Sequence, residues 1–125
     1  MNIYDNLYCK IFIDTNEDME GVLSSISDIV SVYRWTIISD SMEIDLRKNE
    51  DFSKKERVVK EDGFLYSRYY LDIESKENVK QEQYILSIAT LLENLWTLGY
   101  KVVTACDFEE ELPRKGGYRY ENREL

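Results

Sequence analysis

The strongest constraint on the fold is the order in which two kinds of hydrophobic periodicity follow each other. Patterns with a period of two residues, typical of strands, occupy residues 7–14, 35–47, 64–73 and 100–106. Apolar residues recur at helical spacing from Met19 to Val30 and from Tyr84 to Trp96. The chain therefore predicts the order strand, helix, strand, strand, helix, strand.

This order predicts an α+β fold of the ferredoxin-like β-α-β-β-α-β class. Two right-handed crossovers would place both helices on one face of a four-stranded antiparallel sheet. The usual neighbour order is fourth, first, third and second strand. Residues 64–73 carry apolar side chains on both faces, which favours the central place of a third strand. One face of the strand predicted at residues 35–47 ends in acidic side chains, which favours an edge.

The 125 residues suffice for one domain, which we expect to span residues 1–106. Within it, residues 47–63 hold 11 charged residues in 17 positions and end at Asp62-Gly63, so they predict a charged hairpin tip. Residues 107–125 contain Pro113, Gly116 and Gly117 and show little periodicity. We expect them to form a C-terminal arm.

The charge balance narrows the class of partner. There are 25 acidic and 16 basic residues, a net charge of −9, and residues 1–46 alone carry −7. Such a chain repels nucleic acid and anionic membranes and attracts basic proteins. No stretch of 18 uncharged apolar residues is present, so no membrane span is expected. The oligomeric state stays open.

The residue types also limit the catalytic mechanisms and metal sites that the chain can form. The chain has no histidine, which excludes serine–histidine and cysteine–histidine catalysis and most zinc sites. Cys9 and Cys106 form no CxxC motif and are expected to pack as small apolar side chains in a reducing cytoplasm, with no disulfide predicted. We therefore expect a protein that is not an enzyme and holds no metal or cofactor. Catalysis by carboxylates alone stays a third alternative.

Two features predict a contact surface for a partner protein. An acidic run follows the last predicted strand, and two tyrosines stand beside Arg119 and Arg123 in the polar arm, where tyrosine and arginine are favoured interface anchors. Acidic residues on the predicted edge strand extend this surface. The predicted partner-binding residues are Asp107, Glu109, Glu110, Glu111, Tyr118, Tyr120, Glu43 and Asp45.

The last helix and strand with their acidic turn, residues 95–113, read LWTLGYKVVTACDFEEELP. With the small size and acidic charge, this stretch resembles the immunity proteins of bacterial polymorphic-toxin and contact-dependent inhibition systems. The resemblance implies a cytoplasmic protein that binds and neutralises a cognate toxin, often a basic nuclease. It assigns no role to any single residue. The alternative is a small regulatory or sensor domain that dimerises through its sheet and binds a small ligand.

Overall fold

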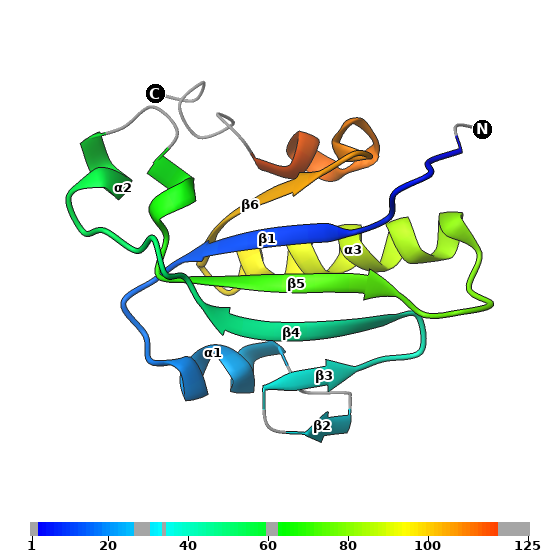
Figure 1. The fold of residues 1–125 in the computed structure, drawn as a ribbon, viewed down its shortest axis with the longest axis horizontal. Helices are drawn as coiled ribbons and strands as arrows, with labels where there is room; N and C mark the ends of the chain where they lie inside the picture. Colours follow the sequence, from blue (N-terminus) through cyan, green and yellow to red (C-terminus); the bar gives the residue numbers. More distant parts are fainter. Residues whose placement is uncertain (1–2, 27–30, 34, 60–62, 118–125) are drawn as a thin grey trace.

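The computed structural model describes residues 3–26, 31–33, 35–59 and 63–117. The strands are β1 (Cys9–Asp14), β2 (Ser31–Tyr33), β3 (Thr36–Ile38), β4 (Met42–Lys48), β5 (Tyr69–Ser75) and β6 (Lys101–Cys106). Figure 1 shows strands interspersed with helices, with β2, β3 and β4 following one another directly in the chain. The helices are α1 (Met19–Ile26), α2 (Glu56–Val59) and α3 (Gln81–Thr97), with short 3-10 turns η1 (Gly63–Tyr66), η2 (Glu109–Glu111) and η3 (Pro113–Gly117).

The strands form one antiparallel sheet in the order β2-β3-β4-β5-β1-β6. The neighbour order predicted for four strands occurs within it as β6-β1-β5-β4, and β5 is central as expected. The predicted number of four strands is wrong, because β2 and β3 extend the described sheet beyond β4. The strand that carries the acidic residues Glu43 and Asp45 is β4. It pairs with β3 and β5, so the prediction that it lies at an edge is wrong.

A turn at residues 39–41 explains one of the additional strands. Ser39 donates its backbone N–H to the Met42 oxygen at 2.9 Å, and its hydroxyl accepts the Met42 N–H at 3.1 Å. This turn reverses the chain, so residues 35–47 form two paired strands in place of the single predicted one. The reversal also shifts the alternation. Ile37 is buried, whereas Ile38, which would share the face of Ile44 in a single unbroken strand, is exposed beside Glu43.

The predicted strand at residues 64–73 begins later than expected. Its first residues form η1, where the Ser67 hydroxyl donates to the Phe64 oxygen at 2.7 Å. Gly63 lies against the backbone of α2, where an added Cβ would be 2.3 Å from the Arg57 oxygen. The predicted tip is thus folded over its described part, and Asn49 binds the Leu65 and Ser67 oxygens at 2.9 and 2.8 Å.

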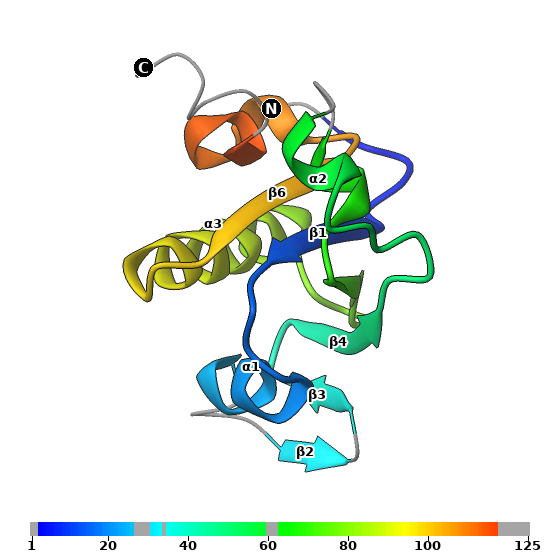
Figure 2. The same cartoon turned by 90° about the vertical axis from the view of Figure 1, so that its left-hand side faces the viewer.

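Helix α3 covers one face of the sheet, behind it in Figure 1 and to its left in Figure 2. The helix ends just before Gly99, which adopts φ +93°. Gly99 N–H donates to the Trp96 oxygen and Tyr100 N–H to the Leu95 oxygen, both at 3.0 Å, which closes a Schellman cap. The buried side chains of α3 are Tyr84, Ile85, Ile88, Leu91, Leu92 and Leu95.

Helix α1 belongs to the same core, because its Val22 is fully buried in the cluster that α3 and the strands form. In Figure 2, α1 lies on the same side of the sheet as α3. Asp18 begins this helix, and its carboxylate accepts the Gly21 N–H at 2.9 Å. The strand residues of this core are Cys9, Ile11, Ile13, Ile37, Met42, Ile44, Leu46, Tyr69, Leu71, Ile73 and Val102.

The described part of the C-terminal arm, residues 107–117, packs back onto α3 and β6. Phe108 is fully buried, with its ring 5.9 Å from those of Tyr4 and Tyr84. Leu112 is also buried, and the Arg114 guanidinium lies 4.7 Å from the Trp96 ring. The beginning of the predicted arm therefore contributes to the core of the preceding residues.

Candidate protein-binding face

The face of the sheet opposite α3 carries polar and aromatic side chains in rows that cross the strands. Figure 1 looks onto this face. Antiparallel partners point to the same side, so the register determines which side chains share a row. One row holds Thr36, Asp45, Asp72 and Lys10, and the next holds Arg47, Tyr70, Phe12 and Val103.

A third row lies at the end of the sheet. Ile38 is opposite Glu43, and Glu43 is opposite Glu74. Tyr8 precedes Cys9, which pairs with Ile73 and Cys106, and Asp107 follows Cys106, so both lie just beyond the paired residues at the same end of the sheet. We call Ile38, Glu43, Glu74, Tyr8 and Asp107 the acidic row; all of them are exposed.

Glu43 and Glu74 are like charges placed directly opposite each other, an arrangement that destabilises a sheet. Within the described chain, no lysine or arginine forms an ion pair with either carboxylate, and neither carboxylate accepts a hydrogen bond. The sheet itself therefore leaves this pair of charges without compensation.

The neighbouring row shows how the same fold compensates a similar pair. Asp45 is opposite Asp72, and Arg47 bridges the two, at 3.4 and 3.1 Å. Asp45 also accepts the Thr36 hydroxyl at 2.6 Å, and Asp72 accepts the Tyr8 hydroxyl. Burial, followed by this hydrogen bond to Asp72, raises the pKa of Tyr8. These carboxylates are satisfied within the chain, in contrast to Glu43 and Glu74.

The row that holds Tyr70 and Phe12 is partly covered by other side chains of the protein. The Lys10 ammonium lies 4.2 Å from the centroid of Tyr70 and 5.0 Å from that of Phe12. Phe64 from η1 packs edge-on against Phe12, with ring centroids 5.3 Å apart. Phe12 is consequently only 5% exposed. The β1 part of this row is therefore covered, whereas Arg47 in the same row and the acidic row at the end of the sheet stay exposed.

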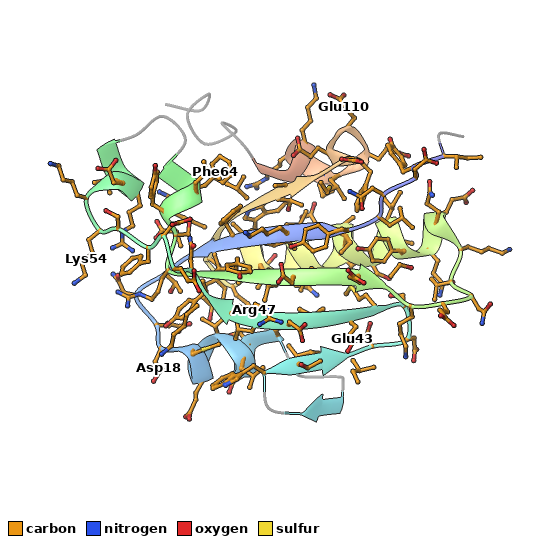
Figure 3. All side chains as sticks on the ribbon, in the orientation of Figure 1. Asp18, Glu43, Arg47, Lys54, Phe64 and Glu110 are labelled. Atoms are coloured by element: carbon orange, nitrogen blue, oxygen red, sulfur yellow. The ribbon has the colours of Figure 1, made fainter. Side chains whose placement is uncertain are left out.

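The sequence-predicted site residues are brought together only in part. Glu43 and Asp107 lie in the same row, but β4 and β6 are three strand spacings apart, or about 14 Å. Figure 3 shows Glu110 beyond the β6 side of the sheet and Glu43 on the β4 side. Asp45 is bound to Thr36 and Arg47, and Glu109 accepts the Cys106 N–H at 3.3 Å. Tyr118 and Tyr120 lie outside the described residues.

Ile38, Glu74 and Tyr8 are the members of this row that the sequence analysis missed. Glu74 lies one residue beyond the predicted strand 64–73, so the sequence pattern did not indicate its face. Only the pairing register places Ile38 and Glu74 beside Glu43, and that register comes from the assembled sheet.

Three lysines lie at the opposite end of the sheet, interspersed with the exposed acidic residues Glu50 and Asp51. Lys48, Lys54 and Lys55 are exposed there, and Figure 3 shows Lys54 on the side away from Glu43 and Glu110. Arg57 is bound to Asp14 at 2.9 Å. The acidic row and these lysines thus occupy opposite ends of the sheet.

Three further results bear on function. In the described residues, no group of three or more histidine, cysteine or acidic side chains is arranged to hold a metal ion. No helix in the same residues is both long and apolar enough to cross a bilayer. Comparison with known proteins found no matching family model, curated protein or solved structure.

Proposed function

We propose that the protein is a non-enzymatic binding module whose acidic row docks a basic protein. The observation that carries this proposal is the uncompensated pair Glu43 and Glu74 on an uncovered sheet face. The fold gains no stability from placing these charges together. A lysine or arginine from a partner would relieve the repulsion, and Ile38 and Tyr8 would add apolar and aromatic contact at its flanks.

The partner class we propose is a cognate toxin, with a basic nuclease as the leading candidate. Carboxylates can occupy the places of substrate phosphates in a nuclease cleft, and opposite charge raises association rates 10- to 1,000-fold. The net charge of −9 and the resemblance of residues 95–113 to immunity proteins support this proposal. The protein would then act in the bacterial cytoplasm as an inhibitor.

The proposed contact surface is centred on Glu43, Glu74 and Tyr8 and extends through Asp107 to Glu110 and Glu111. Asp45 and Glu109 already have partners in the chain, so their proposed role is to hold neighbouring groups in place. Tyr118 and Tyr120 stay predicted contacts of the arm.

The alternative function is a ligand-binding regulatory domain that dimerises through its sheet. The uncovered face with exposed Ile38 and Tyr8 favours this alternative. The two candidates respond oppositely to salt. A face-to-face dimer would bring two acidic faces together and would strengthen as salt screens them, whereas a complex with a basic partner would weaken.

The test is affinity capture from lysate of the native host, with washes at low and at high salt. The bait proteins are the wild type, the double variant Glu43→Gln/Glu74→Gln and the control Lys54→Gln/Lys55→Gln, which removes two charges at the opposite end. We expect wild type and control to retain one basic protein in stoichiometric amount, released by salt. The acidic-row variant should retain much less.

Equal retention by all three baits would overturn the assigned surface. Salt-promoted self-association without a captured protein, from lysate that contains the toxin, would favour the dimeric alternative.

A further inference from the structure

The two cysteines face each other across the first and last strands. Cys9 of β1 is the register partner of Cys106 of β6, and both are free thiols. Directly opposed residues of antiparallel strands have Cα atoms about 4.5 or 5.5 Å apart, depending on the type of pair. Both separations fall within the range of about 4.4–6.8 Å found in disulfides. The side chains also point to the same face of the sheet.

The surroundings make the two thiols unequal. Cys9 is fully buried in the core, whereas Cys106 is only half-buried. A hydrogen bond between the two thiols, followed by burial, raises the pKa of Cys9. Tyr84 of α3 and Glu109 of η2 are the other titratable groups that act on this pair. A reagent from solvent therefore reacts first with Cys106. Cys9 reacts afterwards, with the modified sulfur of Cys106.

We propose that Cys9 and Cys106 are a site of reversible modification that forms an intramolecular disulfide with a small-molecule disulfide oxidant of the glutathione class. This inference stands independently of the proposed function, because it rests on the β1–β6 register that places two free thiols opposite each other.

The reaction proceeds by two exchanges. The Cys106 thiolate attacks the oxidant, its S–S bond breaks, and one glutathione leaves as a thiol. Cys9 then loses its proton and attacks the sulfur of Cys106, which releases the second glutathione. Two protein thiols are oxidised to one disulfide, and one oxidant disulfide is reduced to two thiols. Because burial disfavours the Cys9 thiolate, ring closure is the slower step.

The new bond would join the beginning of β1 to the end of β6, directly before Asp107 and the arm. It closes a loop that contains most of the chain, which restricts the unfolded state strongly. We expect oxidation to raise the Tm by about 10 °C.

The experiment incubates the full-length protein in buffers of increasing oxidised-to-reduced glutathione ratio, followed by acid quench, alkylation and mass spectrometry. The expected product is a monomer that has lost two hydrogen atoms, with a peptide joining Cys9 to Cys106. Cys9→Ser should stop at a stable glutathione adduct on Cys106. Cys106→Ser should leave Cys9 unmodified while the protein stays folded.

Two free thiols in the wild type at every ratio, or a persistent glutathione adduct on it, would overturn the proposal. Disulfide-linked dimers in place of the internal bond would do the same. Because the wild type alone decides these outcomes, the test does not depend on folding of the serine variants.

Discussion

The two faces of the sheet differ in how their side chains are packed and paired. The face beneath α1 and α3 buries continuous apolar rows, such as Ile37, Ile44, Ile73 and Cys9. The opposite face has the same register, but it holds polar and aromatic rows that the chain satisfies unevenly. Arg47 bridges Asp45 and Asp72, whereas Glu43 and Glu74 have no such bridge among the described residues. The face beneath α1 and α3 therefore supplies most of the buried core, whereas Glu43 and Glu74 at the end of the other face stay exposed.

The largest expected loss comes from truncating a buried ring on the covered side. Phe108→Ala removes a fully buried side chain that contacts Tyr4 and Tyr84. We expect it to reduce the free energy of unfolding by about 3–5 kcal/mol, measured by urea denaturation. Leu86→Ala on the exposed side of α3 is the control and should change little. A small loss for Phe108→Ala would show that the arm is not part of the core.

The next effect concerns the close approach of the arm to β6. Gly117 has φ +95°, and an added Cβ would be 2.7 Å from the Val102 oxygen and 3.1 Å from Trp96. Gly117→Ala should cost about 2–3 kcal/mol and shift Trp96 fluorescence, read in a Trp35→Phe background.

Gly99 is the matched control, because its φ is +93° and nothing lies within 4 Å of an added Cβ. Gly99→Ala should cost only the backbone strain, about 1–2 kcal/mol, and leave the Trp96 spectrum unchanged. Equal losses for the two variants would contradict the proposed packing of the arm.

Alkaline pH should lower the free energy of unfolding, because buried tyrosines lose their protons less readily than exposed ones. Burial raises the pKa of Tyr84, whose hydroxyl donates to the Leu7 oxygen at 2.7 Å. An unfolded tyrosine titrates near pH 10. The folded state keeps its proton longer, so this stabilisation is complete below about pH 10 and declines as pH rises above it.

Urea midpoints across this range should therefore fall, and Tyr84→Phe should lessen the slope while lowering stability at neutral pH. An unchanged slope in Tyr84→Phe would assign the alkaline transition to other groups.

A smaller effect is expected at Thr104, whose hydroxyl is buried without a hydrogen-bond partner in the described structure. Thr104→Val replaces this hydroxyl by a methyl group of similar size. We expect the free energy of unfolding, measured by urea denaturation, to stay unchanged or to rise by up to about 1 kcal/mol. Thr90→Val on the exposed side of α3 is a control. A clear destabilisation by Thr104→Val would indicate that the hydroxyl is bound.

Alternation and helical spacing were sufficient to predict the central strands and the helix that contains Tyr84 to Trp96. They did not predict the reversal at Ser39, because alternation continues on both sides of a tight turn and its hydrogen bonds to Met42 depend on the folded loop. They also placed Phe64 in a strand, since a 3-10 turn held by Ser67 leaves little periodic signal.

The residues of the candidate site also fall into those that the sequence could predict and those that depend on the assembled sheet. Charge placement alone selected Glu43 and Asp107, which lie in the same row. Glu74 was missed because its importance comes from its cross-strand partner, and a register one residue away would have placed it elsewhere. Conversely, Asp45 and Glu109 were selected by charge although the chain itself satisfies them.

The most direct test of the difference between the faces is a double-mutant cycle on Glu43 and Glu74, measured as the free energy of unfolding at low salt. Glu43→Gln and Glu74→Gln should each leave stability unchanged or raise it. The coupling between them should be repulsive by about 0.2–1 kcal/mol and shrink in high salt. A double variant less stable than the wild type by about 1 kcal/mol or more would mean that the fold uses these charges, which would contradict their assignment to a partner.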